Sequence, residues 1–304
     1  MASNQVSLRD KVNHLTANLN PNSPLVFHEI SSLRAQIKAW KQAGLTIGFV
    51  PTMGALHHGH LALVKRAKDL CDKVVCSIFI NPMQFAAHED LDKYPRQIDQ
   101  DLLSLTAMGC DSVYLPEKKI IYPEDFSSLV HVGGPSTGLE TDFRPQFFDG
   151  VTTIVCKLFN QVTPHIAIFG EKDYQQLMTI KAMVRDLDMD IEVLGHDTLR
   201  EADGLASSSR NAYLNTEERA IAAQIYKNLC TVRDELRSGA ITEQVLKAAC
   251  ERLIEAGFKS IDYIELRHAH DLKPVLGPLS HTGTYRLLAA LWLGQTRLID
   301  NIEV

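Results

Sequence analysis

Residues 46–80 read TIGFVPTMGALHHGHLALVKRAKDLCDKVVCSIFI, and this stretch decides the fold. The first five residues form an apolar run that Pro51 ends, which predicts a strand. Residues 61–71 repeat apolar side chains at helical spacing, and residues 74–80 form a continuous apolar run, typical of a strand covered on both faces. A strand, a helix and a second buried strand at this spacing indicate a right-handed βαβ unit with parallel strands.

The same alternation continues to about residue 194. Strands are predicted at residues 111–115, 165–169 and 190–194, and helices at residues 97–108, 150–161 and 172–186. We therefore expect an α/β domain with a parallel sheet. Residues 1–24 lack the apolar core of a secretory signal, and we expect a flexible extension there, with a transit peptide as the alternative.

The pattern of predicted helices and strands changes after Gly204. Two helices are predicted, one from Thr216 to about residue 238 and one from Thr242 up to Gly257, each with its threonine as N-cap candidate. Three apolar runs follow, at residues 261–266, 285–293 and 296–302. Helices followed by consecutive strands indicate a small α+β domain, with the polar stretch 200–204 as the hinge.

Composition excludes several classes of protein. The chain has 304 residues, 45% hydrophobic and 22% charged, which is globular composition rather than that of a disordered or fibrous chain. A net charge of −6 argues against broad binding to nucleic acid or to acidic membranes, and no run of 18 apolar residues spans a bilayer. The six cysteines form no C-x-x-C pair, so we expect reduced thiols and the cytoplasm.

Residues 51–60, PTMGALHHGH, leave the first predicted strand and enter a helix. Backbone N–H groups and the helix dipole at such a junction can face an anion, and Gly54 and Gly59 permit close approach. His57 and His60 point the same way, so two imidazoles can bind a triphosphate and stabilise charge at a phosphorus under attack. Surface histidines on a glycine turn are the alternative, and a zinc site lacks an acid or cysteine at ligand spacing.

Three further segments carry polar side chains next to predicted strands or the hinge. Residues 81–85, NPMQF, follow a buried strand at its carboxyl end, where ligands of open α/β sheets bind, and Asn81 and Gln84 suit hydroxyls and a carboxylate. A polar turn is the alternative. Residues 203–211, DGLASSSRN, combine hydroxyls with the guanidinium of Arg210, a compact phosphate grip unless this is an ordinary serine-rich loop.

Residues 169–176, FGEKDYQQ, repeat the strand–glycine–helix arrangement. Lys172 lies in the first helical turn, where a cation is unfavourable unless an anion lies between it and the helix, so we interpret it as a phosphate partner. Asp173 can accept hydrogen bonds from ribose hydroxyls, and Gln176 lies one turn further along the same face. A charged surface turn is the alternative.

H-x-G-H after a strand resembles the nucleotidyltransferase superfamily that includes class I aminoacyl-tRNA synthetases. PTMGALHHGH, NPMQF, GEKDYQQ, SSRN and the final LIDNI resemble, in order, the pantothenate synthetase (pantoate–β-alanine ligase) family across about residues 25–304. The resemblance implies a Rossmann-like domain of the HxGH type over residues 25–198 and an α+β lid domain over residues 199–304.

The resemblance also implies an activity. Pantoate and β-alanine would condense to pantothenate with ATP cleaved to AMP and pyrophosphate, through pantoyl adenylate, with Mg²⁺ accompanying ATP and with a homodimer as the assembly. No Ser-His-Asp or Cys-His pair is evident, so an acyl-enzyme is not indicated. The charge of the phosphates would be neutralised by Mg²⁺, the cations and the two histidines.

Site residues are carried over from the matching motifs. The implied ATP-binding residues are Met53, Gly54, His57, Gly59, His60, Gly170, Glu171, Lys172, Asp173, Leu199, Ser207, Ser208, Ser209 and Arg210. The implied pantoate-binding residues are Gln84, Gln176, Met53 and Asn81, and Gln84 would also meet β-alanine. His60, His57 and Lys172 are the implied catalytic residues, with His60 the one most needed at the transferring phosphate.

The sequence departs from the family pattern at three positions. His58 stands where the family commonly has an acid, and Ser207 where it often has Met. Gln100 replaces the first of two magnesium-associated acids, while Asp101 keeps the second and is the predicted metal ligand.

Two alternatives stay open at this point. One is another adenylylating enzyme of the superfamily, such as a phosphopantetheine or nicotinamide-mononucleotide adenylyltransferase, which would generally lack the NPMQF and KDYQQ pair and the C-terminal domain. The other is a catalytically inactive nucleotide-binding module, which would have lost H-x-G-H or Lys172, and both are present.

Overall fold

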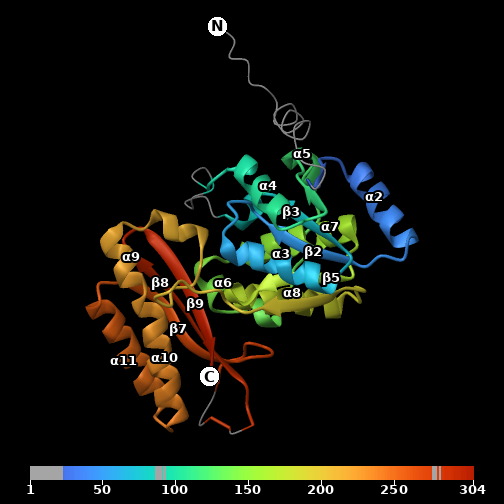
Figure 1. The fold of residues 1–304 in the computed structure, drawn as a ribbon. Helices are drawn as coiled ribbons and strands as arrows, with labels where there is room; N and C mark the ends of the chain where they lie inside the picture. Colours follow the sequence, from blue (N-terminus) through green and yellow to red (C-terminus); the bar gives the residue numbers. More distant parts are fainter. Residues whose placement is uncertain (1–22, 86–90, 92–93, 276–278, 281) are drawn as a thin grey trace.

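The computed structural model describes residues 23–85, 91, 94–275, 279–280 and 282–304. All but the last two residues of the predicted extension, residues 1–24, lie outside the described residues. Figure 1 shows two bodies side by side, one around a sheet that includes β2, β3 and β5 and one around β7, β8 and β9. The predicted α/β domain followed by a smaller α+β domain is confirmed.

The larger sheet, within the described residues, has six parallel strands in the order β1-β4-β3-β2-β5-β6. The strands are β1 (Leu25–Phe27), β2 (Ile47–Thr52), β3 (Lys73–Ile78), β4 (Ser112–Tyr114), β5 (Ile166–Gly170) and β6 (Glu192–His196). Each of the five later strands overlaps a predicted run. The prediction omits β1 and the helix α2 behind it, because a three-residue strand is too short to show a period.

Helices cover both faces of the larger sheet. They are α2 (Ile30–Gln42), α3 (His58–Leu70), α4 (Ile98–Ala107), α7 (Phe147–Val162) and α8 (Tyr174–Asp186), with the short α5 (Lys118–Ile121) and α6 (Glu140–Phe143). On one face α2, α7 and α8 pack around Phe49, and on the other α3 and α4 pack around Val50. These neighbours on β2 are both fully buried, since alternate side chains of a strand point to opposite, covered faces. No helix in the described segments is long and apolar enough to cross a bilayer.

The strand order reverses between β2 and β5. From β2 the chain adds β3 and β4 on one side, and it then returns to add β5 and β6 on the other. Ligands of open parallel sheets bind beyond the carboxyl ends of the strands at such a switch point. Because β2 ends at Thr52 and β5 at Gly170, the histidine segment and the Lys172 segment both start there.

The smaller domain packs three antiparallel strands, in the order β7-β8-β9, against helices. Its elements are α9 (Thr216–Ala222), α10 (Gln224–Arg237), α11 (Thr242–Glu255), β7 (Ser260–His268), β8 (Tyr285–Leu293) and β9 (Thr296–Glu303). One face of the sheet buries Leu287 and Leu291 in a core shared with α10 and α11. The other face, with Tyr263 and Leu288, packs against Leu139 of the larger domain. The sheet therefore connects the two domains.

The helix starts of the smaller domain differ from the prediction. The N-cap of α9 is Asn215, whose side chain accepts from the N–H of Glu218 at 2.9 Å while Glu218 accepts from the N–H of Asn215 at 3.0 Å. Thr216 and Thr242 are instead the first helical residues. The predicted helix over residues 216–238 is also two helices, divided at Ala223.

The predicted hinge, residues 200–204, is bonded to the smaller domain. Arg200 donates to both carboxylate oxygens of Asp300 on β9, at 2.7 and 3.0 Å, and pairs through its backbone with Ala206. Two charge-assisted bonds to a buried carboxylate do not fit a hinge at Arg200. The domain boundary after residue 198 stays a prediction.

Replacing Asn215 by Ala is expected to lower the free energy of unfolding by about 1 kcal/mol, because the first turn of α9 loses its cap. Thr216→Ala is the matched control and is expected to change it by less than about 0.5 kcal/mol. Urea unfolding followed by circular dichroism measures both variants. Equal losses would show that Asn215 does not act as the cap.

Candidate active site

Helix α3 begins with two histidines that cap its first turn. His57 is the N-cap, and its Nδ1 accepts from the N–H of Gly59 at 3.1 Å. His60 Nδ1 accepts from the N–H of His57 at 3.4 Å. The ring centroids are 4.1 Å apart. The two imidazoles thus form a reciprocal capping box in place of the usual hydroxyl and carboxylate.

These bonds fix the tautomer of both rings. A backbone N–H can only donate, so the Nδ1 atom that it meets carries a lone pair, and the proton of the neutral ring is on Nε2. His57 and His60 both line the cavity described below. Each ring therefore keeps one donor, Nε2–H, for a ligand.

Burial keeps both imidazoles neutral. It lowers the pKa of His57 to about 4, with the cation of Lys172 acting in the same direction. Burial, His57 and Lys172 lower the pKa of His60 to about 3. The expectation that the histidines help to neutralise phosphate charge is therefore corrected. At neutral pH they are uncharged hydrogen-bond donors.

The glycines of this segment serve its internal packing. A Cβ on Gly59 would lie 2.8 Å from Cε1 of His57, so a side chain there would displace the capping ring. Gly54 has a φ of +83°, and its Cβ would lie 3.1 Å from Oδ2 of Asp101. Gly54 does not line the cavity, which differs from its predicted place at ATP.

Asp101 accepts hydrogen bonds from the backbone of the segment that carries the two histidines. Its Oδ2 accepts from the N–H of Ala55 at 2.9 Å, and its Oδ1 accepts from the N–H of Leu56 at 2.8 Å. Burial raises the pKa of this carboxyl, although both backbone bonds oppose the shift. Asp101 is 1% exposed and does not line the cavity, and its predicted role as a metal ligand stays a prediction. Its hydrogen bonds fix the positive-φ turn that precedes the histidines and thereby orient them.

Asn81 acts on Gln84 rather than on the cavity. Asn81 is 1% exposed, and its amide donates to Oε1 of Gln84 at 2.9 Å and to the carbonyl of Gly150 at 3.0 Å. Its own oxygen accepts from Tyr122 at 2.8 Å. Of the two, Gln84 alone lines the cavity, and with Oε1 engaged its amide N–H groups are left for a ligand. The predicted contact of Asn81 with pantoate does not fit this placement.

The turn after β5 places Lys172 at the switch point. Residues Glu171–Asp173 form a 3-10 turn, η3, that leads into α8. Lys172, Asp173 and Gln176 line the cavity. Glu171 does not, because its carboxylate pairs with Arg286 of the smaller domain at 3.0 Å. Glu171 thus makes a contact between the domains, and its predicted contact with ATP stays a prediction.

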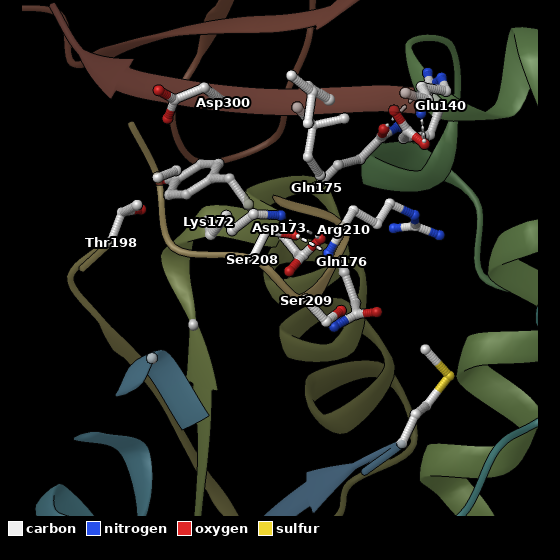
Figure 2. A pocket seen from close by; sticks show the side chains of 18 of the residues that line it. Glu140, Lys172, Asp173, Gln175, Gln176, Thr198, Ser208, Ser209, Arg210 and Asp300 are labelled. Atoms are coloured by element: carbon white, nitrogen blue, oxygen red, sulfur yellow. Dashed lines mark hydrogen bonds and ion pairs between the residues drawn. The ribbon is translucent and has the colours of Figure 1, made fainter. Parts of the chain in front are cut away.

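The serine segment reaches the cavity from the side of the smaller domain. Ser207 donates to Glu201 at 2.8 Å, and Ser208 caps the short helix η4 (Ser209–Tyr213) by accepting from the N–H of Arg210. Figure 2 shows Ser208, Ser209 and Arg210 close to Lys172, Asp173 and Gln176 around one space. The residues of the predicted phosphate grip and the predicted phosphate lysine therefore line the same cavity.

These segments enclose a cavity of about 1220 Å³, which is large enough for a nucleotide and a second substrate. The predicted site residues that line it are Met53, His57, Gly59, His60, Gln84, Gly170, Lys172, Asp173, Gln176, Leu199, Ser207, Ser208, Ser209 and Arg210. Gly54, Asn81, Asp101 and Glu171 lie behind this wall.

Sequence reasoning missed several lining residues. Tyr94 is buried and lines the cavity together with Ser209 and Arg210. Arg144 donates to the backbone carbonyl of Gln84 at 2.9 Å from the turn before α7. The sequence pattern that could have indicated Arg144 is a cation just ahead of an apolar helix. Arg297 of β9 lines the cavity through tertiary packing alone, and no local pattern indicates it.

Nitrogen-detected NMR at pH 7 is expected to show an unprotonated Nδ1 and a protonated Nε2 in His57 and His60. Because both pKa values lie below the ordinary 6.5, the unfolded chain binds more protons than the fold, and the free energy of unfolding should decrease as pH falls from 6.5 toward 4. His60→Gln should flatten this dependence. A cationic imidazole at pH 7 would contradict the tautomer assignment.

Comparisons with known proteins agree with this geometry. The family model described as pantoate-beta-alanine ligase matches residues 25–303. The chain is 48% identical to the pantothenate synthetase of Mesorhizobium japonicum over 92% of this chain and 98% of that protein. The solved pantothenate synthetase of Thermus thermophilus is 40% identical, with a TM-score of 0.83 over 91% of this chain and 98% of that one.

A further solved relative carries ligands. The pantoate-beta-alanine ligase of Francisella tularensis, complexed with beta-gamma ATP and beta-alanine, is 33% identical, with a TM-score of 0.77 over 92% of this chain and 97% of that one. The match runs through both domains and through every motif of the cavity wall. This chain therefore belongs to the pantoate–β-alanine ligase family.

Proposed function

We propose that this chain condenses pantoate with β-alanine at the expense of ATP, with pantoyl adenylate as the intermediate. The observation that carries the proposal is the cavity at the switch point, where two neutral histidine donors, Lys172 and Arg210 line one space. Membership in the family excludes the alternative adenylyltransferases of the superfamily and an inactive module.

The reaction has two displacement steps. The pantoate carboxylate attacks the α-phosphorus of ATP, and the bond to the β-phosphate oxygen breaks to release pyrophosphate. The β-alanine amine then attacks the acyl carbon, loses a proton and displaces AMP. Neither step needs an enzyme nucleophile, so the protein contributes alignment and charge stabilisation.

ATP fits the wall formed by the two helix starts and the serine segment. Lys172 and Arg210 would contact the phosphates, and the Nε2–H donors of His57 and His60 would meet the α-phosphate oxygens as charge develops there. Neutral donors gain hydrogen-bond strength in a buried site without the cost of desolvating a further cation beside Lys172. Asp173 lies in the same wall and would accept from ribose hydroxyls.

Pantoate fits the part of the cavity between Gln84 and Gln176. The free amide N–H groups of Gln84 can donate to carboxylate or hydroxyl oxygens. Apolar residues of α7, including Val151 and Val155, line the same cavity and suit an aliphatic acid with methyl groups. Met53 completes this side, and β-alanine would enter beside Gln84.

Mg²⁺ would enter with ATP as part of the substrate. In the part of the chain that the structure describes, no group of three or more His, Cys, Asp or Glu side chains is arranged to hold a metal ion. Asp101 spends both carboxylate oxygens on backbone N–H groups. Mg²⁺ characteristically keeps several waters and binds substrate phosphates with few protein ligands, which agrees with this arrangement.

Two further proposals are a homodimer, which rests on the family resemblance, and a cytoplasmic location, which rests on the thiols. All six cysteines are unpaired, and burial raises the pKa of Cys76 and Cys110. Thiols of this kind suit a reducing compartment.

Pyrophosphate release from ATP and Mg²⁺ is expected to depend on pantoate, and sustained AMP formation is expected only when β-alanine is also present. His60→Ala should reduce the rate by about 10²–10³, the usual loss for one donor to a developing charge. His58→Ala is the matched control, because His58 is exposed and adjacent, and it should retain the wild-type rate. An absence of pantoate-dependent pyrophosphate from the wild-type chain would overturn the proposal.

Asp101→Asn is expected to lower the free energy of unfolding by about 1–3 kcal/mol, since one backbone N–H then faces an amide donor. The Mg²⁺ concentration for half-maximal rate should stay that of the wild type, because Asp101 does not hold the ion. Asp99→Asn, an exposed neighbour, should change neither quantity. A large rise in the Mg²⁺ requirement of Asp101→Asn alone would restore Asp101 as a ligand.

A further inference from the structure

Asn301 of β9 bonds directly to the turn that carries Lys172. Its Nδ2 donates to the backbone carbonyl of Glu171 at 2.9 Å and to that of Lys172 at 2.8 Å. The residue is 3% exposed, although it belongs to the smaller domain. One amide group thus spends both of its N–H donors on the backbone of the catalytic turn.

Arg286 reinforces the same attachment from the neighbouring strand. Its Nε donates to Oδ1 of Asn301 at 2.6 Å, which fixes the orientation of the amide, and its NH2 group donates to the carboxylate of Glu171 at 3.0 Å. The guanidinium also lies over the ring of Tyr174, 4.2 Å from the centroid. The turn is therefore bonded to β8 and β9 through both backbone and side chain.

Asp300, the preceding residue, holds the serine segment. Both of its oxygens accept from Arg200, whose NH1 also donates to the carbonyl of Gly204 at 3.1 Å. The backbone of Arg200 pairs with Ala206, and the N–H of Ser207 donates to the carbonyl of Leu199 at 2.9 Å. Figure 2 shows Asp300 on its strand above Lys172 and Ser208 in that view.

We propose that Asp300 and Asn301 are positioning residues that set the phosphate lysine and the serine segment at a fixed separation. The proposal rests on the proposed function, since it deepens the account of how ATP is held. Asp300 accepts from Arg200, just ahead of the serine segment, and Asn301 donates to the turn that carries Lys172, and both segments line the same cavity. Through these bonds the strand supplies the geometry that in-line attack requires.

A purely structural role would predict a different result. Asn301 would then stabilise the contact between the domains, and its loss would lower stability without a specific effect on the lysine. Asn228 offers a matched comparison in the same domain. It is 7% exposed, donates to the carbonyl of Ala249 at 2.8 Å and accepts from Arg252 at 2.8 Å, yet it lies outside the cavity wall.

The test compares Asn301→Asp with Asn228→Asp in the full chain. Asn301→Asp places an acceptor against two carbonyls, so the turn should move, kcat for pantoate-dependent pyrophosphate release should fall on the order of 10–100-fold, and ATP should bind more weakly. Asn228→Asp should lose comparable thermal stability while keeping kcat within about twofold. Asn301→Ala, which removes the donors without adding charge, covers the case in which Asn301→Asp does not fold.

A double-mutant cycle decides whether Asn301 acts through Lys172. In a Lys172→Ala background, Asn301→Asp should weaken ATP binding, measured by calorimetry, by less than about twofold. Equal losses with and without Lys172, or wild-type kcat in Asn301→Asp, would overturn the proposal. Because ATP affinity is measured without pantoate, a wild-type chain that binds ATP but releases no pyrophosphate would refute the proposed function and still allow the cycle to decide the role of Asn301.

Asp300→Asn provides the second arm through the serine segment. It should weaken ATP binding in the wild-type background and have little further effect once Arg210 is replaced by Ala, since both changes act on the same segment. If the losses of ATP affinity caused by Asp300→Asn and by Arg210→Ala were additive, Asp300 would not act through the serine segment. That result would remove Asp300 from the proposal.

Discussion

Because β2 and β5 pair in parallel where the strand order reverses, two strand-to-helix turns lie side by side at one edge of the sheet. Each turn leads into a helix whose first N–H groups have no partner within the helix. That edge is therefore electropositive before any side chain is considered. The cavity, the histidines and Lys172 all depend on this pairing, and an anion is the ligand that it favours most.

The chemistry of the wall follows from the cost of burying charge. A second and third cation beside Lys172 would be expensive in a buried site, and both histidines are accordingly neutral, with pKa values lowered to about 4 and about 3. Their capping bonds direct one donor each toward the cavity. Asp101 supports the arrangement from behind by accepting from the turn that carries them. Asp101 thus lies outside the wall, whereas the donors of His57 and His60 lie within it.

The smaller domain contributes more than a cover. Its three-stranded sheet buries one face against α10 and α11 and the other against the larger domain, so β9 lies between the two halves of the molecule. The polar residues that this position buries must find partners, and Asp300 finds one in Arg200 while Asn301 finds them in the turn that carries Lys172. The same hydrogen bonds therefore give the buried polar groups their partners and fix the arrangement of the site.

Hydrophobic periodicity and strand-to-helix motifs predicted the βαβ order and the second domain, because these are local properties of the sequence. The set of side chains expected at the cavity came from the resemblance of those motifs to the family. Local patterns do not report which polar residue is buried. Tertiary packing decided that Asn81 bonds to Gln84, that Glu171 pairs with Arg286, and that Asp101 accepts from the backbone of Ala55 and Leu56. Glu171 stands between two wall residues in sequence, Gly170 and Lys172, yet its partner Arg286 is remote. The partners of Asp101 are remote as well, and only the folded chain brings these groups within hydrogen-bond distance.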